Sequence, residues 1–417
     1  MNLNATRNRT RAWLALAVSA LWIFSSGCSS AAFPSSGGSN GGENPPTGAN
    51  VQAISVNIGP TAAAGDGSFI DGAFTSVTVC VPGSTTQCQT INGILVDTGS
   101  FGLRILSSAL TVSLPQQVDA SNNPVAECAP FASGVIWGPV QTADFTIAGE
   151  KAASLPIQVI GSPSFSTIPT VCSSEGTPVE DLASLGANGI LGVGAFSQDC
   201  GTTCAISGPS NPGIYYTCPA SGCVQTTEAI SSQVVNPVTL FATDNNGVIV
   251  ELPSLSGTAT NLDGFLIFGI GTESNNGVGS ATVFGIDSST GNFTTTFSGV
   301  AYPEAFIDSG SNAIYFLDPT TTGLPACTDF TFWYCPTAAT NLSATNQGTN
   351  GSSGQINFSV GNADSLVSDP SIGAANGLAG PFPNVFDWGL PFFFRRNVYV
   401  AIDGQPTSAG PGPYWAY

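Results

Sequence analysis

Gly93-Ile94-Leu95-Val96-Asp97-Thr98-Gly99-Ser100 and Glu304-Ala305-Phe306-Ile307-Asp308-Ser309-Gly310-Ser311 are two copies of one pattern, far apart in the chain. In each copy an apolar run leads into Asp-Thr/Ser-Gly-Ser. Such a run predicts a buried strand, and the glycine lets the chain reverse directly after the acid. One Asp-Thr-Gly usually marks an ordinary turn, but two in the same context predict two carboxylates held for chemistry.

The paired motifs resemble those of the pepsin-like aspartic proteases, in which two similar lobes each contribute one catalytic aspartate. The resemblance implies a mainly β, bilobal double β-barrel with an active cleft between the lobes. It divides the chain into an N-terminal lobe over residues 51–235 and a C-terminal lobe over residues 236–417. Strand-like alternation from Val51 onward, 50 glycines and 29 prolines also favour strands and turns.

Three further stretches carry the resemblance. Gly189-Ile-Leu-Gly-Val-Gly194 matches the hydrophobic-hydrophobic-Gly element that braces the first aspartate loop of the family. Leu262-Asp-Gly-Phe-Leu-Ile-Phe-Gly269 resembles the central strand that opens the C-terminal lobe, and Gly389–Asp403 resembles the C-terminal bracing element and the final strands. Gly-Leu-Arg after the first motif and the run of three phenylalanines near the end resemble more closely an uncharacterised group of bacterial lipoproteins, a domain of unknown function.

The resemblance assigns a role to each motif residue. Asp97 and Asp308 match the catalytic acids, which share one proton because two adjacent carboxylates cannot both ionise cheaply, as aspartic proteases as a class illustrate. The charged acid takes a proton from a water molecule that attacks the peptide carbonyl, while the protonated acid donates to the carbonyl oxygen. The supporting residues brace the loops, permit the turns and hydrogen-bond the acids: Thr98, Gly99, Ser100, Ser309, Gly310 and Ser311.

Two positions depart from the family pattern. Pepsin-like enzymes present a tyrosine on a flap over the substrate, but Cys128–Gly134 contains none. Phe131 or Trp137 would close the site by packing, or each is a core aromatic. Leu390-Pro391 replaces the aspartate that pepsins commonly carry after the glycine. Near the first motif, Arg104 either pairs with a carboxylate or is a solvated or structural arginine.

The composition excludes several function classes. The chain has 417 residues and no histidine, which excludes Ser-His-Asp and Cys-His catalysis and histidine zinc sites. Seven basic residues against 26 acidic ones give a formal charge of −19, so no basic patch is available for nucleic acid. We expect no cofactor, no metal and no nucleic-acid partner, and a monomer that meets peptide or protein substrates.

The N-terminus reads as an export signal over residues 1–28, followed by a flexible Ser/Gly/Pro tether over residues 29–50. Three arginines precede the apolar Ala12–Phe24, and Cys28 follows Ser26-Gly27. The stretch resembles a bacterial lipoprotein signal with Cys28 as the lipidated residue, although Ser25 stands where leucine is usual. We expect an exported protein, lipid-anchored at the bacterial envelope in the periplasm or at the outer membrane. Alternatively, Cys28 is a thiol in an ordinary cleaved leader.

Cysteine counting supports export. Eleven cysteines are present, and removing Cys28 leaves ten that can pair in an oxidising compartment. Near neighbours are expected to close loops. The spacing of the four cysteines between residues 200 and 223 also allows a metal site, although an exported chain favours disulfides. The ten candidates are Cys80, Cys88, Cys128, Cys172, Cys200, Cys204, Cys218, Cys223, Cys327 and Cys335.

Three functions remain open on these grounds. The paired motifs favour an envelope-anchored aspartic endopeptidase. The alternative is a catalytically inactive pepsin-like lipoprotein that binds peptides or other ligands in its cleft, since a fold does not determine function. A structural or adhesive surface lipoprotein fits the Gly/Ser/Thr richness, but the intact motifs argue against it. Residues 337–354 are a polar Gly/Asn/Thr stretch without periodicity.

Overall fold

The computed structural model describes residues 45–60 and 69–417. The predicted signal, its Cys28 and residues 29–44 of the predicted tether lie outside the described residues. The described chain is mainly β, with 44 % strand and 10 % helix, which confirms the predicted class. Its strands form one 15-stranded sheet, one 7-stranded sheet and two small pairs.

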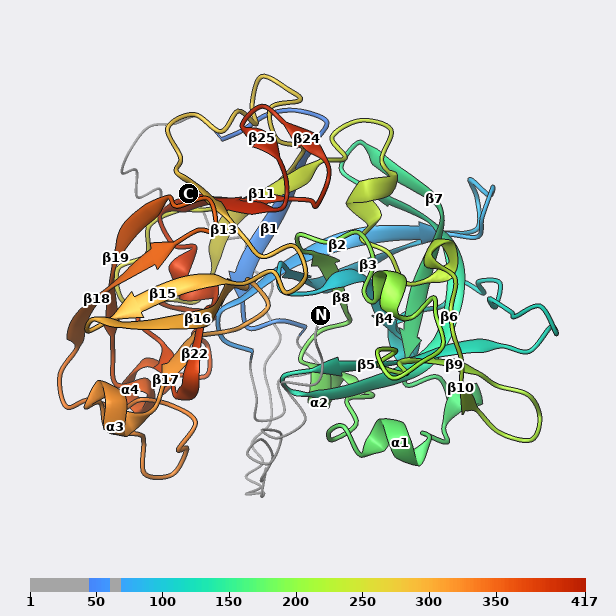
Figure 1. The fold of residues 1–417 in the computed structure, drawn as a ribbon, viewed down its shortest axis with the longest axis horizontal. Helices are drawn as coiled ribbons and strands as arrows, with labels where there is room; N and C mark the ends of the chain where they lie inside the picture. The colour runs from blue at the N-terminus through green and yellow to red at the C-terminus, as the bar shows by residue number, and fades with distance from the viewer. Residues whose placement is uncertain (1–44, 61–68) are drawn as a thin grey trace, which may run out of the picture.

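The large sheet is partly closed into a barrel. Strand β6 pairs with β7 and also with β2, so that β6, β7, β4, β8, β3 and β2 form a ring. Figure 1 shows these strands together in blue, cyan and green, from the centre to the right of the view. In spatial order the sheet contains β10 (Val224–Gln225), β9 (Tyr215–Thr217), β5 (Val125–Phe131), β6 (Gly134–Ile147), β7 (Glu150–Ile160), β4 (Phe101–Leu106), β8 (Gly189–Val193), β3 (Cys88–Asp97), β2 (Gly72–Cys80), β1 (Val51–Asn57), β13 (Leu262–Phe268), β11 (Gly247–Leu252), β23 (Arg396–Ala401), β26 (Tyr414–Ala416) and β14 (Val283–Gly285).

The second sheet lies on the left of Figure 1, in orange and red. It contains β19 (Ser353–Val360), β18 (Thr340–Gln347), β15 (Phe293–Phe297), β16 (Val300–Ile307), β22 (Phe382–Trp388), β17 (Ile314–Leu317) and β21 (Ala379–Gly380). The small pairs are β12 (Thr258–Ala259) with β20 (Ala374–Ala375), and β24 (Pro406–Thr407) with β25 (Gly410–Pro411).

The described helices are short. The α-helices are α1 (Thr170–Ser173), α2 (Leu182–Leu185), α3 (Pro319–Thr322) and α4 (Ala363–Leu366). Single 3-10 turns are η3 (Ser107–Ala109), η4 (Pro163–Phe165), η5 (Gly201–Thr203), η6 (Ile230–Ser232), η7 (Pro237–Leu240) and η8 (Leu390–Phe392). Within the described ranges no helix is long and apolar enough to span a membrane.

Strand β1 joins the two halves of the chain. It pairs with β13 from Val51 opposite Ile267 to Val56 opposite Leu262, and it pairs with β2 on its other side. In Figure 1, β1, β11 and β13 lie between the two groups of strands. The largest core cluster likewise contains side chains from both halves, and Phe241 contacts both Phe145 and Phe268.

The polar stretch without periodicity contains a regular strand. Thr340–Gln347 is the strand β18, paired with β19 along all eight residues. Ala344 and Asn346 are buried, whereas most of the other side chains are more exposed. The pattern of apolar residues is weak because polar Asn346 occupies a buried position, where its side-chain oxygen accepts from Thr295 Oγ1 at 2.7 Å.

All ten candidate cysteines form disulfides, between Cys80 and Cys88, Cys128 and Cys172, Cys200 and Cys204, Cys218 and Cys223, and Cys327 and Cys335. The hairpin and loop closures predicted from near neighbours are confirmed. The four cysteines between residues 200 and 223 are used in disulfides, so the metal alternative fails there. Five disulfides are typical of an exported protein.

The Cys128–Cys172 disulfide is expected to contribute most to stability, because it spans 44 residues whereas Cys80–Cys88 spans 8. Chain-entropy reasoning gives about 4 kcal/mol for the long loop and about 2.5 kcal/mol for the short one. Replacing each pair by serines and measuring urea unfolding tests this. A larger loss from opening Cys80–Cys88 would contradict it.

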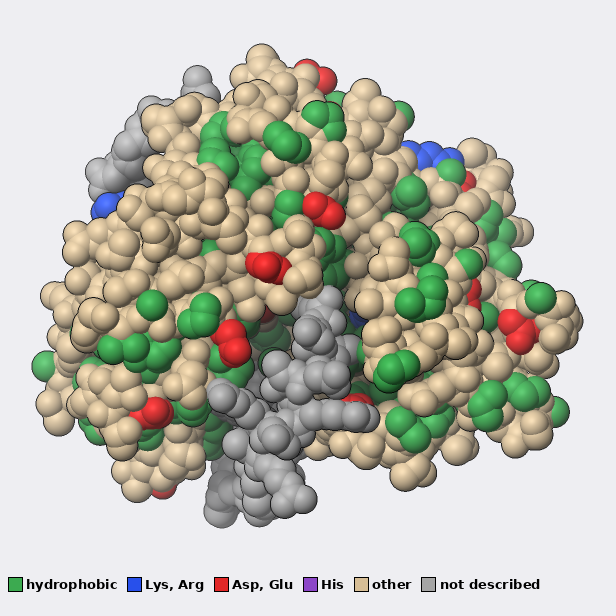
Figure 2. Space-filling view, in the orientation of Figure 1, with side chains coloured by type: hydrophobic (Ala, Val, Ile, Leu, Met, Phe, Trp, Pro, Cys, Tyr) green, Lys and Arg blue, Asp and Glu red, His purple; other side chains and the backbone are tan. Residues whose placement is uncertain are grey.

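The surface carries few charges. Figure 2 shows a face on which acidic side chains are scattered singly among uncharged ones, and few basic atoms are visible. Of the seven basic residues, four lie in the described chain: Arg104, Lys151, Arg395 and Arg396. Arg104 is buried.

Candidate active site

Each acid lies at the end of a strand that a second strand supports: Asp97 is the last residue of β3, and Asp308 directly follows β16. Strand β8 runs parallel to β3 and places Gly192 opposite Asp97. Strand β22 runs parallel to β16, and the Asp308 N–H donates to the Trp388 carbonyl at 3.1 Å. The predicted bracing of the first acid by Gly189–Gly194 is thereby confirmed. A Cβ on Gly192 would lie 2.6 Å from the Phe101 nitrogen, so only glycine fits.

The two motif loops are tied to each other by reciprocal hydrogen bonds. The Thr98 N–H donates to Ser309 Oγ at 3.1 Å, and the Ser309 N–H donates to Thr98 Oγ1 at 2.9 Å. Ser309 Oγ in turn donates to the Val96 carbonyl at 2.7 Å, so each loop is held by the backbone of the other. Both Thr98 and Ser309 are buried, where such bonds are least exposed to competition from water.

The glycines set the distance between the acids. The Gly99 N–H lies 2.8 Å from Asp97 Oδ1 and 3.1 Å from Asp308 Oδ1, so one donor serves both carboxyls. A Cβ on Gly99 would lie 2.5 Å from Asp308 Cγ, and one on Gly310 would lie 2.7 Å from Asp97 Cγ. Each acid therefore packs over the glycine of the opposite motif, and any side chain at either glycine would separate the acids.

The serines complete the hydrogen bonding of each acid. Ser100 Oγ donates to Asp97 Oδ2 at 2.5 Å, and the Ser100 N–H reaches Asp97 Oδ1 at 3.2 Å. On the other side, the Gly310 N–H donates to Asp308 Oδ1 at 2.7 Å, and Ser311 Oγ lies 2.9 Å from Asp308 Oδ2. The structure thus brings together all eight predicted motif residues.

The environment favours a proton on Asp308. Burial raises the pKa of Asp308 well above its usual range, and the neighbouring carboxyls of Asp97 and then Asp387 raise it further. Asp97 itself accepts three hydrogen bonds from Gly99 and Ser100, an arrangement that suits a carboxylate. The pair can therefore hold one proton donor and one proton acceptor side by side.

Sequence reasoning missed a third carboxyl, Asp387. It lies on β22, opposite Phe306 of β16 and Tyr315 of β17, and is only 4 % exposed. Ser311 Oγ lies 2.6 Å from Asp387 Oδ2, which links Asp387 to Asp308. Burial raises the pKa of Asp387 well above its usual range. The available signal was a lone acid in the otherwise uncharged run Phe382–Trp388, directly before the Gly389 element.

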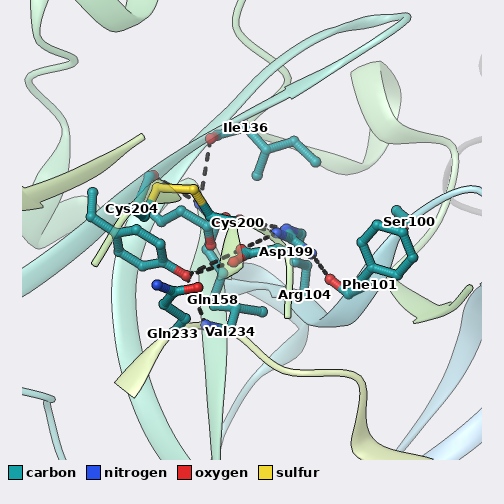
Figure 3. Close-up of polar contacts among 12 residues, drawn as sticks. Ser100, Phe101, Arg104, Ile136, Gln158, Asp199, Cys200, Cys204, Gln233 and Val234 are labelled. Atoms are coloured by element: carbon teal, nitrogen blue, oxygen red, sulfur yellow. Dashed lines mark hydrogen bonds and ion pairs between the residues drawn. A yellow bond between two sulfur atoms is a disulfide. The ribbon is translucent and has the colours of Figure 1, made fainter. Parts of the chain in front are cut away.

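A buried cluster of charged side chains lies behind the first acid loop. Arg104, 2 % exposed, donates from Nη2 to Glu127 Oε1 at 2.7 Å and to Asp199 Oδ2 at 3.0 Å. It also donates from Nε to Gln158 at 3.0 Å and from Nη1 to the Phe101 carbonyl at 2.6 Å. Figure 3 shows Arg104 between Phe101, which follows Ser100, and Asp199. Of the two interpretations of Arg104, pairing with carboxylates is the correct one.

The cluster holds more acid than base. Asp199 also accepts from Tyr215 Oη at 2.9 Å, and Tyr215 Oη accepts the Val234 N–H at 2.7 Å. Burial raises the pKa of Asp199 well above its usual range, and the adjacent Glu127 carboxyl raises it further, against the lowering by Arg104. One guanidinium therefore faces two buried carboxyls, and the raised pKa of Asp199 favours a proton on that side chain.

The hairpin of β5 and β6 occupies the place of the predicted flap in the sequence. Trp137 is a core aromatic: it is 1 % exposed, donates from Nε1 to the Phe165 carbonyl at 2.8 Å and contacts the Tyr216 ring edge-on. Phe131 is half-buried, and its ring centre lies 5.5 Å from Arg104 Cζ. The hairpin is therefore in contact with the Arg104 cluster, and a closing role for Phe131 stays a prediction.

Other sites in the described residues are poorer candidates. A shallow hollow of about 230 Å³ is lined by Ser207, Asn211 and Gln225, away from the motif acids. Cys327, Cys335 and Asp364 have metal-like spacing, but the two cysteines form a disulfide and offer no thiolate.

Glu228 is expected to make folding pH-dependent. Burial raises the pKa of this half-buried carboxyl to about 7, with a smaller contribution from Asp119. The folded protein therefore holds the Glu228 proton more tightly than the unfolded chain does. Its contribution to stability is fully present below the unfolded pKa near 4.3 and is lost as the pH rises through the folded pKa of about 7. After allowance for solvent screening, we expect the change in unfolding free energy caused by Glu228→Gln to be about 1 kcal/mol more stabilising at pH 7.5 than at pH 4.5. Urea unfolding at both pH values measures this, and an equal effect at both would contradict it.

Comparison with known proteins gives a family and no function. No curated protein matches the chain. A family model described as "Protein of unknown function (DUF3443)" matches residues 46–417, which include both acid motifs, Asp387 and the Arg104 cluster. The chain therefore belongs to this DUF3443 family of unknown function.

Proposed function

We propose that the protein is an aspartic endopeptidase with a pepsin-like bilobal fold. The observation that carries the proposal is that two cross-braced loops place Asp97 and Asp308 around one shared donor, the Gly99 N–H. A turn with a purely structural role gives no reason for two acids from distant strands to be in contact, or for their surroundings to differ. Carboxyl pairs whose surroundings separate their proton affinities are typical of acid–base catalysis.

The proposed reaction uses the two acids in opposite roles. Asp97 as a carboxylate takes one proton from a water molecule, whose oxygen attacks the carbonyl carbon of the peptide. Asp308 donates its proton to the carbonyl oxygen, giving a neutral tetrahedral diol. When the diol collapses, the C–N bond breaks, the amine nitrogen takes the proton from Asp97, and a diol hydroxyl proton returns to Asp308. The serine and glycine donors keep both carboxyls in place throughout.

The setting of the enzyme is part of the proposal. The predicted leader and Cys28 support a lipid-anchored protein of the bacterial envelope that acts as a monomer on exported peptides or proteins. The disulfides support export. Lobes over residues 51–235 and 236–417, with the cleft between them, fit the positions of the two acids, one in each proposed lobe.

A second candidate function is peptide binding without cleavage. It is favoured by the absence of a tyrosine in Cys128–Gly134 and by Leu390-Pro391 after the second bracing glycine, where the structure has the turn η8. A binder would keep the cleft without needing matched acids. The intact pair favours the enzyme.

A transition-state-mimicking aspartic protease inhibitor separates the two functions. We expect the inhibitor to raise the melting temperature of the protein and to stop cleavage of a mixed peptide library between pH 3 and 7. A binder would give the thermal shift with peptides but no cleavage at any pH. If the folded protein shows neither a thermal shift nor cleavage, both functions are contradicted.

A further inference from the structure

A single hydroxyl lies between Asp387 and the proposed catalytic acid Asp308. Ser311 Oγ is 2.6 Å from Asp387 Oδ2 and 2.9 Å from Asp308 Oδ2. A serine hydroxyl has one proton to donate, so it can donate to only one of these carboxyls at a time. The other carboxyl must then donate to Ser311 and must itself be protonated, since two unprotonated oxygens would otherwise face each other at hydrogen-bond distance.

This constraint allows two arrangements. With Asp387 ionised, Ser311 donates to Asp387, and the proton of Asp308 turns to Ser311 and away from Asp97. With Asp387 protonated, Asp387 donates to Ser311, Ser311 donates to Asp308, and the proton of Asp308 is free to face Asp97 and a substrate carbonyl. Only the second arrangement suits the proposed reaction.

The surroundings of Asp387 favour the protonated form. Its Oδ1 is buried and has no hydrogen-bond partner among the described residues, which would be costly for a carboxylate. The titratable groups facing it are Asp97 and Asp308 across Ser311, and Tyr315 on β17, with buried Asp71 beyond Tyr315. The ion pairs of the described chain involve none of these carboxyls, so no basic side chain offsets their charge.

We propose that Asp387 is a positioning residue whose protonation turns the Ser311 hydroxyl toward Asp308 and so aims the Asp308 proton at the substrate. Its catalytic consequence rests on the proposed function, but the hydroxyl switch itself does not. Asp387 touches neither the water nor the substrate and acts through Ser311. The site therefore comprises three coupled carboxyls that share two protons in the active form.

Carbon NMR tests the switch without substrate. The full chain is labelled with [4-¹³C]aspartate, and the Asp308 and Asp387 signals are followed from pH 3 to 9. We expect the Asp308 signal to show a second step that coincides with the titration of Asp387. Ser311→Ala keeps all three carboxyls and should reduce that step to less than half. An Asp308 signal without the second step, or a step unchanged in Ser311→Ala, would overturn the proposal.

The pH profile tests the catalytic consequence. Asp387→Asn offers an amide N–H to Ser311 at every pH. We therefore expect its cleavage activity to persist to higher pH, with the basic limb of the kcat/KM profile shifted upward by about one pH unit. Asp244→Asn, a substitution of another acid that is 4 % exposed, should leave that limb unchanged. An unmoved or lowered limb in folded Asp387→Asn would overturn the proposal. Wild-type protein that cleaves nothing would contradict the proposed function, and the carbon signals would still decide the switch.

Discussion

Replacing Asp97 or Asp308 by asparagine is expected to lower kcat/KM for peptide cleavage by about 10³-fold or more, because general acid–base catalysis by one positioned group contributes roughly 10²–10⁴-fold. The two acids have opposite roles, so an amide at either position removes the proton transfers that this acid makes. Asparagine has nearly the same shape and can keep part of the hydrogen bonding with Gly99 and Gly310. The loss should therefore appear in kcat and not in folding.

The double variant provides an internal check. Residues that act as one unit give non-additive losses, so Asp97→Asn with Asp308→Asn should be little worse than either single variant. Asp181→Asn, a change at the exposed cap of α2, is the control and should keep full activity. Losses that multiply in the double variant, or a single variant with wild-type activity, would contradict the paired roles.

Replacing Arg104 by methionine is expected to cost about 3–5 kcal/mol of unfolding free energy, because removing one partner of a buried ion pair leaves its carboxyls without compensation. Glu127 is fully buried and Asp199 nearly so, with side chains 0 % and 7 % exposed. The loss should be larger at pH 7 than at pH 4, since burial raises the pKa of Asp199 and this carboxyl can be protonated in acid. Denaturant unfolding at the two pH values measures both effects.

Lys151→Met is the matched control. Lys151 also pairs with a carboxylate, Asp144 at 3.1 Å, but its side chain is 54 % exposed. Exposed pairs contribute about 0–1 kcal/mol, so this variant should be nearly as stable as the wild type. Equal losses from the two variants would show that the burial of the Arg104 cluster is not what makes it important.

The Arg104 cluster also supports the active site. Its Nη1 holds the Phe101 carbonyl, one residue after Ser100, and its guanidinium lies near the Phe131 ring on the β5–β6 hairpin. The same arginine therefore joins the first acid loop to the hairpin. Loss of activity in Arg104→Met at temperatures where the protein remains folded is expected to accompany the loss of stability.

The parts that the sequence predicted are those set by local pattern. An apolar strand, an acid, a hydroxyl and a glycine are adjacent in each motif, so the roles of Asp97 and Ser309 could each be proposed from its own short stretch of sequence. Disulfides between near neighbours, such as Cys80–Cys88, followed from the same kind of local reasoning. The mainly β class followed from composition and alternation.

The missed parts depend on tertiary contacts. Asp387 enters the site only because β22 runs parallel to β16, a pairing that its sequence neighbours do not reveal. The partners of Arg104 come from β5 and from the loop before Cys200, so the choice between a paired and a solvated arginine could not be made locally. Strand β18 was missed because polar Asn346 is satisfied inside the core by Thr295.

Incubation of a mixed peptide library with purified wild type, Asp97→Asn and Asp308→Asn between pH 3 and 7 tests the central claim most directly. The wild type is expected to cut internal peptide bonds, best in mildly acid solution, and both variants to leave the library intact. Cleavage that persists undiminished in both variants, or no cleavage by folded wild type at any of these pH values, would contradict an aspartic endopeptidase.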